Sequence, residues 1–200
     1  EQGSGPMERV KLGGSAVEVS RICLGTMTFG NQTAEAEAHA QMDAALEVAM
    51  TFMDCAEMYP VNPVRRETVG LSEEIIGRWL ARTGNRDRVE IATKITGPSQ
   101  MVRDGAPFDG ATVTACIDAS LRRLQTDRID LYQLHTPDPG TPIAETLDAL
   151  DDPDLQRHRN AQGDPVRERQ AYRRGRDGGH QRAPRARGGF WEGRMSRRTL

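Results

Sequence analysis

The chain has 200 residues, of which 36% are hydrophobic and only 4% aromatic, and its formal net charge is −2. That balance hides a break near residue 150: residues 1–150 carry 22 acidic and 14 basic side chains, whereas residues 151–200 carry 13 arginines, no lysine and 7 acidic residues. The last segment holds too few large apolar side chains for a core of its own, while the first is long enough for one domain. No run of 18 apolar residues occurs, so neither a membrane-spanning helix nor a membrane partner is expected.

The predicted elements begin with a β-hairpin and continue as alternating strands and helices. The hairpin joins Glu8–Leu12 to Ala16–Ser20 through two glycines, a typical turn signal. Ser72 is expected to cap the second helix and Gly84 to follow its end. By hydrophobic periodicity the strands cover residues 21–25, 51–54, 88–94 and 128–135, and the helices cover 33–50, 71–82, 112–125 and a fourth that begins at Thr141-Pro142.

Four alternations of strand and helix require a parallel sheet covered by helices. They fit half of an eightfold β/α barrel or a small doubly wound sheet. A dinucleotide-binding doubly wound sheet would need GxGxxG after its first strand, whereas the segment from Gly25 to Gly30 has a different spacing.

The two ends of the chain are expected to lie outside this domain, which covers residues 7–150. Residues 1–6 lack the charge and apolar run of a signal peptide and are interpreted as an extension or a cloning scar. Residues 151–200, rich in Arg, Gly and Pro, have a composition typical of disorder or of out-of-frame translation. Their positive charge suits nucleic acid, but regularly interleaved aromatic residues are missing, so RNA binding through this tail is the third and least favoured of the alternative functions.

The three cysteines, Cys23, Cys55 and Cys116, are widely spaced, and none belongs to a CxxC pair. This usage is typical of reduced thiols in a cytoplasmic protein. We expect all three to fill the core.

Ionisable residues follow consecutive predicted strands. Asp54, Lys94 and His135 each stand where an apolar run closes, and Tyr59 comes shortly after Asp54. Because active sites of parallel α/β domains lie at the carboxyl ends of the strands, these side chains are expected to converge. Taken singly, each has a structural alternative: a turn or cap aspartate, a solvated lysine, a packed tyrosine or a structural histidine.

Together, the four residue types suit proton transfer to an oxygen. An ammonium group beside a tyrosine favours the phenolate, and an aspartate could supply the counter-charge that a buried lysine needs. A histidine can donate a hydrogen bond to a substrate oxygen. Such a set could protonate an alkoxide as it forms.

The sequence resembles the aldo-keto reductase family, particularly a bacterial branch with an Asp-x-Ala-Glu-Met-Tyr-Pro segment. The resemblance runs in unbroken order over about residues 7–150. The matching segments are Cys23-Leu-Gly-Thr-Met-Thr-Phe-Gly30, Asp54-Cys-Ala-Glu-Met-Tyr-Pro60, Glu67-Thr-Val-Gly-Leu-Ser-Glu73, Ile91-Ala-Thr-Lys94 and Leu121-Arg-Arg-Leu-Gln-Thr-Asp-Arg-Ile-Asp-Leu-Tyr-Gln-Leu-His135.

The resemblance implies a TIM-type (β/α)8 barrel, of which this chain holds about the first four βα units, preceded by the hairpin that closes the barrel bottom. It also implies an oxidoreductase that reduces aldehydes or ketones with NADPH and needs no metal. Gly25, Thr26 and Met27 would lie beside the nicotinamide end of the cofactor, with Asp54 near its ribose.

For catalysis, the resemblance implies Tyr59 as proton donor, Lys94 and Asp54 as its tuning partners, and His135 as the donor that orients the carbonyl. Cys55 and Thr136 depart from the residues common in the family, and Thr136 is expected to reshape the substrate pocket.

The four further strand–helix units of the family are not found after residue 150. A truncated, non-catalytic fragment that acts as a binding or regulatory module, or is inactive, is therefore the alternative function. Its open edges predict self-association.

Overall fold

The computed structural model describes residues 7–150, so the predictions for residues 1–6 and 151–200 lie outside the described part. The chain starts with the predicted antiparallel hairpin of β1 (Arg9–Lys11) and β2 (Glu18–Ser20). Its tip includes Gly13 at a φ of +56°, a conformation that glycine adopts without steric cost. The hairpin is thus formed as the turn signal predicts.

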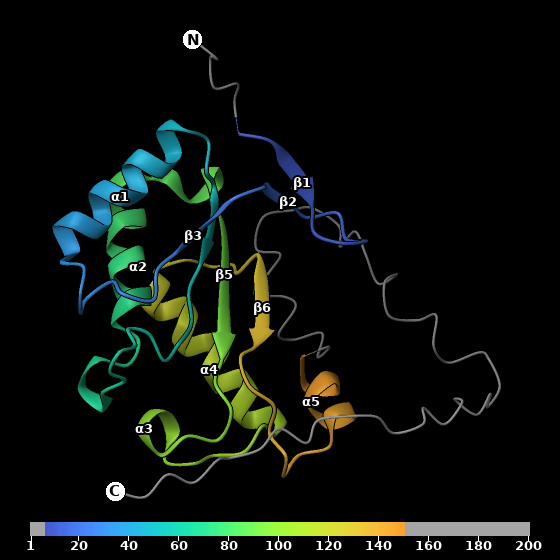
Figure 1. Cartoon of the computed structure of the whole chain (residues 1–200). Helices are drawn as coiled ribbons and strands as arrows, with labels where there is room; N and C mark the ends of the chain where they lie inside the picture. Colours follow the sequence, from blue (N-terminus) through green and yellow to red (C-terminus); the bar gives the residue numbers. More distant parts are fainter. Residues whose placement is uncertain (1–6, 151–200) are drawn as a thin grey trace, which may run out of the picture. The chain divides into compact units, whose positions relative to one another are not determined.

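Four parallel strands form the sheet, in the order β3-β4-β5-β6. Each strand is followed by a helix, as the alternation of apolar runs predicts (Figure 1). The strands are β3 (Cys23–Gly25), β4 (Phe52–Asp54), β5 (Glu90–Ile95) and β6 (Leu131–Leu134). The helices are α1 (Glu35–Glu47), α2 (Leu71–Thr83), α3 (Gln100–Arg103), α4 (Gly110–Leu124) and α5 (Ile143–Leu150), with short 3-10 turns at Arg66–Thr68 and Asn85–Arg88.

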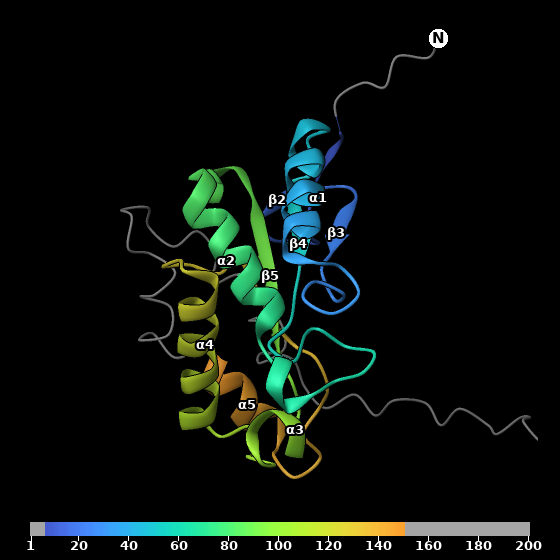
Figure 2. The same ribbon diagram turned by 90° about the vertical axis from the view of Figure 1, so that its left-hand side faces the viewer.

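The core lies between one face of the sheet and helices α1, α2 and α4, which Figure 2 shows side by side. Met53 and Ile91 point from the strands into this layer and are fully buried. Trp79 of α2 lies there too, and its indole N–H donates to Asp43 of α1 at 2.8 Å. Side chains alternate across a strand, so the opposite face of the sheet is left for a site.

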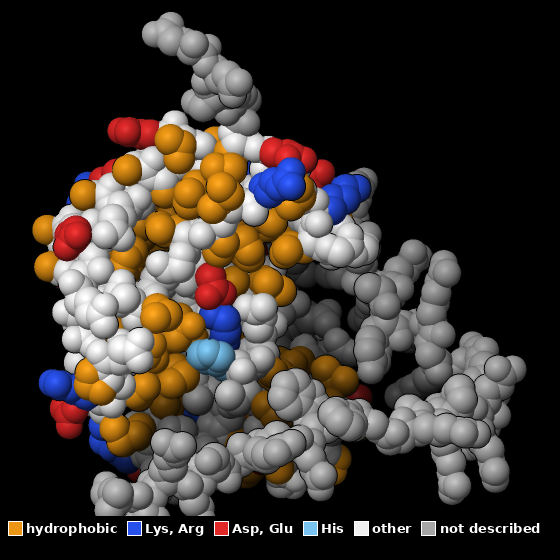
Figure 3. Space-filling view, in the orientation of Figure 1, with side chains coloured by type: hydrophobic (Ala, Val, Ile, Leu, Met, Phe, Trp, Pro, Cys, Tyr) orange, Lys and Arg blue, Asp and Glu red, His pale blue; other side chains and the backbone are white. Residues whose placement is uncertain are grey.

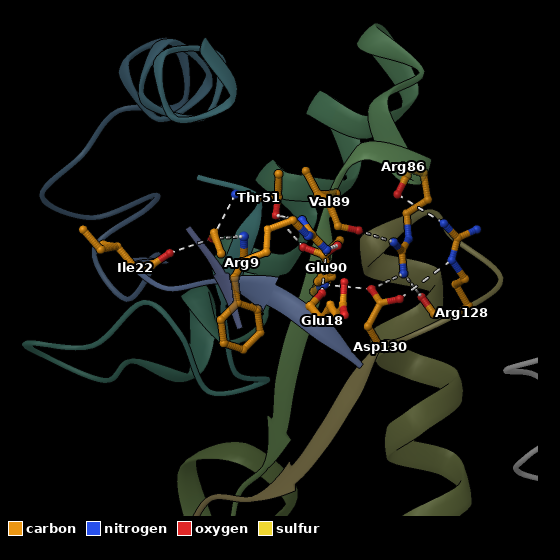
Figure 4. A network of polar contacts seen from close by, with 12 residues as sticks. Arg9, Glu18, Ile22, Thr51, Arg86, Val89, Glu90, Arg128 and Asp130 are labelled. Carbon is orange, nitrogen blue, oxygen red and sulfur yellow. Dashed lines mark hydrogen bonds and ion pairs between the residues drawn. The ribbon is translucent and has the colours of Figure 1, made fainter. Parts of the chain in front are cut away.

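The hairpin is fastened to the sheet at the end where the strands begin (Figures 1 and 4). The Arg9 guanidinium donates to the Thr51 hydroxyl at 2.9 Å and to the Glu90 carboxylate at 2.7 Å. The Ser20 hydroxyl oxygen accepts from the backbone N–H groups of Thr51 and Phe52, both at 3.0 Å. The opposite end of the sheet, where the strands finish, is therefore free of the hairpin.

All four strands of the sheet begin later than their apolar runs predict, β6 by the largest margin. Arg86 donates to the Asp130 carboxylate at 2.7 Å and to the Arg128 carbonyl at 2.9 Å, and Asp130 also accepts from the Ile91 N–H at 2.8 Å (Figure 4). These bonds tie the 3-10 turn at Asn85–Arg88 to the segment before β6, where Asp130 also donates its N–H to the Ile91 carbonyl of β5 at 3.1 Å. The short helix α3 has no clear periodicity and was not predicted.

Three further expectations are corrected. Ser72 does not cap α2: Gly70 is the N-cap residue, and the buried Ser72 hydroxyl donates to the Phe29 carbonyl at 2.8 Å. The last helix begins at Ile143, one residue after the expected proline. Cys55 and Cys116 are buried as expected, but Cys23 is exposed on the edge strand β3 and fills no core.

Candidate active site

The four predicted site residues come from neighbouring strand ends. Asp54 is the last residue of β4, and His135 directly follows β6. Lys94 lies one residue before the end of β5, which continues to Ile95. The parallel register pairs Asp54 with Ala92 and Lys94 with Gln133, so these carboxyl ends meet at one edge of the sheet.

Lys94 is the centre of the polar contacts. Its ammonium nitrogen lies 2.7 Å from the Asp54 carboxylate and also donates to the Cys55 carbonyl at 2.7 Å. The Lys94 side chain is mostly buried, and such a charge needs a partner of opposite sign. The ion pair therefore holds Lys94 in one place beside the end of β4.

Tyr59 reaches the same place from the loop that follows β4. It is only 8% exposed, and the Lys94 nitrogen lies 5.1 Å from the centroid of its ring. The rings of Tyr59 and His135 meet edge to face, with centroids 5.7 Å apart and an angle of 83° between their planes. Tyr59 thus lies against both the ammonium group and the imidazole.

The backbone N–H of His135 donates to the Ile95 carbonyl at 2.9 Å, and this bond fixes the position of the residue beside β5. Its ring atom Nδ1 is buried and has no hydrogen-bond partner among residues 7–150. Burial, and secondly the Lys94 charge, lower the pKa of His135 below its ordinary value of 6.5. The imidazole is therefore neutral at neutral pH and keeps one N–H donor.

The predicted cofactor segment also lies at this end of the sheet. Both the N–H and the hydroxyl of Thr26 donate to the Asp54 carbonyl, at 3.1 and 2.9 Å. Gly25 precedes it at the end of β3, where an added Cβ would meet no atom within 4 Å. Met27 is 41% exposed. The fold therefore brings the predicted catalytic residues together, with the segment Gly25–Met27 beginning beside Asp54.

In the space-filling view, an acidic, a basic and a histidine side chain are adjacent near the middle of this face, bordered by hydrophobic side chains (Figure 3). Thr136, which is predicted to reshape the substrate pocket, accepts the Gly97 N–H at 2.9 Å with its hydroxyl oxygen. That bond joins the segments that follow β5 and β6.

With this geometry in place, residues 21–155 match the aldo/keto reductase family. The chain belongs to this family. Protein tas of Escherichia coli strain K12 is 41% identical over 165 residues, covering 72% of this chain and 47% of that protein. The uncharacterized oxidoreductase YrpG of Bacillus subtilis is 40% identical over 151 residues, covering 72% of this chain and 45% of that protein.

Among solved structures, the holo form of the aldo-keto reductase AKR11C1 from Bacillus halodurans matches with a TM-score of 0.62 and 34% identity. The match covers 76% of this chain and 47% of that one. The chain thus spans about half the length of the curated relatives it matches. The predicted fold class is confirmed: βα units of a (β/α)8 barrel, preceded by a hairpin.

Sequence reasoning missed two members of the site's surroundings, Glu57 and Arg103. Glu57 is 4% exposed although it is charged, and it forms an ion pair with Arg103. Its place between Asp54 and Tyr59 was a signal that could have marked it. Arg103 could not have been found, because it comes from α3, which shows no pattern in the sequence.

None of the helices in the described ranges is both long and apolar enough to span a membrane.

Proposed function

We propose that this site reduces the carbonyl group of an aldehyde or ketone to an alcohol, with NADPH as hydride source and Tyr59 as proton donor. The observation that carries the proposal is the position of the Tyr59 ring, 5.1 Å from the Lys94 ammonium and in edge contact with His135. Family membership supports an oxidoreductase of this kind.

The residues around Asp54 fit the nicotinamide end of a dinucleotide. Gly25 leaves open space beside its backbone, and Met27 offers an exposed apolar side chain against which a flat ring could pack. Gly25, Thr26, Met27 and Asp54 would hold this end of the cofactor. When bound, NADPH would supply the hydride that the carbonyl carbon takes up.

Tyr59 would give its hydroxyl proton to the carbonyl oxygen, so that one O–H bond breaks as the O–H bond of the alcohol forms. The phenolate left behind is favoured by the neighbouring Lys94 ammonium, which Asp54 keeps in place. Neutral His135 would donate its N–H to the same carbonyl oxygen and orient it.

The proposal is tested by following NADPH oxidation by the purified 200-residue chain after addition of a reactive aldehyde such as nitrobenzaldehyde. We expect oxidation that requires both chain and aldehyde and is faster with NADPH than with NADH. Binding of NADPH is measured separately by the change in its fluorescence. A chain that binds NADPH but never oxidises it in the presence of aldehydes or ketones would contradict the proposed reaction.

A second candidate function is a binding or regulatory module without catalysis. The two outer strands favour it, because β3 and β6 each have a single neighbour in the part of the chain that the structure describes. The same experiment separates the two functions, since a module of this kind predicts no aldehyde-dependent oxidation, whether or not it binds NADPH.

A further inference from the structure

A buried carboxylate connects the two segments that carry the site. Glu57 comes three residues after Asp54 and two before Tyr59. Its N–H donates to the Lys94 carbonyl at 3.2 Å, and its carboxylate accepts from the Thr96 N–H at 2.6 Å. Glu57 therefore bonds the loop after β4 to the end of β5 through both its backbone and its side chain.

Arg103 completes this connection from α3. Its guanidinium donates to the Glu57 carboxylate and to the Thr96 carbonyl, and it also lies against the Phe108 ring, 5.9 Å from the centroid. The side chains of Glu57 and Arg103 are both largely buried. Burial makes such bonds strong when they are complete and makes the loss of one partner costly.

We infer that Glu57, held by Arg103, is the positioning residue that sets the Tyr59 ring against Lys94 and His135. The path is short: Glu57 bonds the Lys94 carbonyl on β5 and the Thr96 N–H just after that strand, and Tyr59 follows two residues later on the same loop. The inference rests on the proposed function, because the position of the Tyr59 ring matters to the reaction only if Tyr59 is the proton donor. The geometric statement itself can be tested without turnover.

Glu73 offers a matched control within the same chain. It too is a buried glutamate, and it accepts from the Thr93 hydroxyl and from Arg123, both at 2.6 Å. These bonds join α2 and α4 to β5, and neither of them is made to Glu57, Thr96 or Arg103. Removing the Glu73 charge therefore removes a comparable buried ion pair while every bond of Glu57 stays in place.

The test is an NMR measurement of the nuclear Overhauser effect between the Tyr59 and His135 ring protons in the full 200-residue chain. Tyr59→Phe and His135→Gln identify the two rings among the 3 tyrosines and 4 histidines. The edge-to-face contact predicts a clear cross-peak in the unsubstituted chain. We expect Glu57→Gln to reduce that cross-peak at least several-fold and Glu73→Gln to leave it unchanged, with the amide spectrum reporting that each variant is folded.

The titration of His135 separates positioning from charge, because the Glu57 carboxylate also raises the pKa of His135 slightly against the dominant effect of burial. Glu57→Gln is therefore expected to lower that pKa and to remove the cross-peak. A lowered pKa with an intact cross-peak would overturn the inference, since Glu57 would then act by charge alone. Loss of the cross-peak in folded Glu73→Gln would also overturn it.

If Glu57→Gln does not fold, Arg103→Met replaces it, because that variant keeps the bond from the Thr96 N–H to Glu57. The same loss of the cross-peak is expected, and its retention would overturn the inference. NADPH oxidation is not part of this readout. Failure of the proposed function would thus show as absent turnover with the ring contact intact, and failure of the inference as an intact contact in the variants.

Discussion

At the scale of single residues, His135 is the site residue whose protonation is clearly shifted by its surroundings. Burial and the Lys94 charge lower its pKa, while Asp54 and Glu57 oppose the shift. Its buried Nδ1 has no hydrogen-bond partner in residues 7–150, so no hydrogen bond described there stabilises a proton on that atom. A neutral imidazole can donate its N–H to a carbonyl oxygen as a hydrogen bond, and in the proposed reaction the transferred proton is left to Tyr59.

This shift predicts a pH dependence of stability. The pKa of His135 is lower in the folded chain than in the unfolded one, so between the two values the unfolded state binds more protons. Its contribution to stability is complete above about pH 6.5 and is lost as the pH falls toward the folded value. Carbon-13 NMR titration should give a midpoint below 6.5, and His135→Gln should weaken the acid sensitivity of urea unfolding. A midpoint at or above 6.5 would contradict the buried geometry.

At the scale of elements, helices α2 and α4 approach each other so closely that only a glycine fits between them. An added Cβ at Gly77 of α2 would collide with the Arg123 carbonyl oxygen and lie 2.8 Å from the Leu124 carbonyl carbon. Both are backbone atoms, which cannot move aside as a flexible side chain can. The contact also brings Glu73 within reach of Arg123.

Gly77→Ala should therefore destabilise the fold, even though alanine is favoured over glycine by about 1 kcal/mol in a helix. We expect a loss of about 1–3 kcal/mol, as is common for overpacked cores. Gly110→Ala at the start of α4 is the control, because its nearest contact would be the Ala149 Cβ at an ordinary 3.9 Å. Urea unfolding measures both, and a Gly77→Ala chain as stable as the control would show that the helices are not in this contact.

The buried faces of the helices and the ends of the strands could be predicted from the sequence, whereas bonds between distant segments could not. Helical periodicity located the buried faces of α1 and α4, including Met42 and Val113, because burial repeats with the helix turn. The convergence of Asp54 with Lys94 also followed, since parallel strands finish at one edge. Bonds between distant segments leave no periodic pattern, which is why the Ser72 bond to Phe29 and the Arg103 bond to Glu57 were missed.

At the scale of the whole molecule, the unpaired edges of β3 and β6 are the places where a second copy of the chain could pair with the sheet. Each strand has one neighbour among residues 7–150, and Ile22, next to β3, is 53% exposed. Open strand edges favour pairing with another chain, whereas a closed barrel has none. Two copies of four strands make eight, and a twofold axis would pair β6 of each copy with β3 of the other.

We therefore propose that the chain self-associates through these edges. Sedimentation velocity should show a dimer, and Ile22→Lys, which places a charge beside the β3 edge, should shift the population toward monomer. The exposed Val48 at the end of α1 serves as a control position, since Val48→Lys makes the same kind of change at a helix end and not next to an outer strand in sequence. A monomeric chain that unfolds in one cooperative step would rule out this assembly.

The most direct test of the catalytic assignment is the rate of NADPH-dependent aldehyde reduction by Tyr59→Phe compared with the unsubstituted chain. The substitution removes the hydroxyl proton and keeps the ring that packs against His135. Loss of a general acid typically lowers the rate by about 10²–10⁴-fold, and that loss is expected at saturating NADPH with little change in cofactor affinity. Near-full turnover by Tyr59→Phe would contradict the assignment of Tyr59 as proton donor.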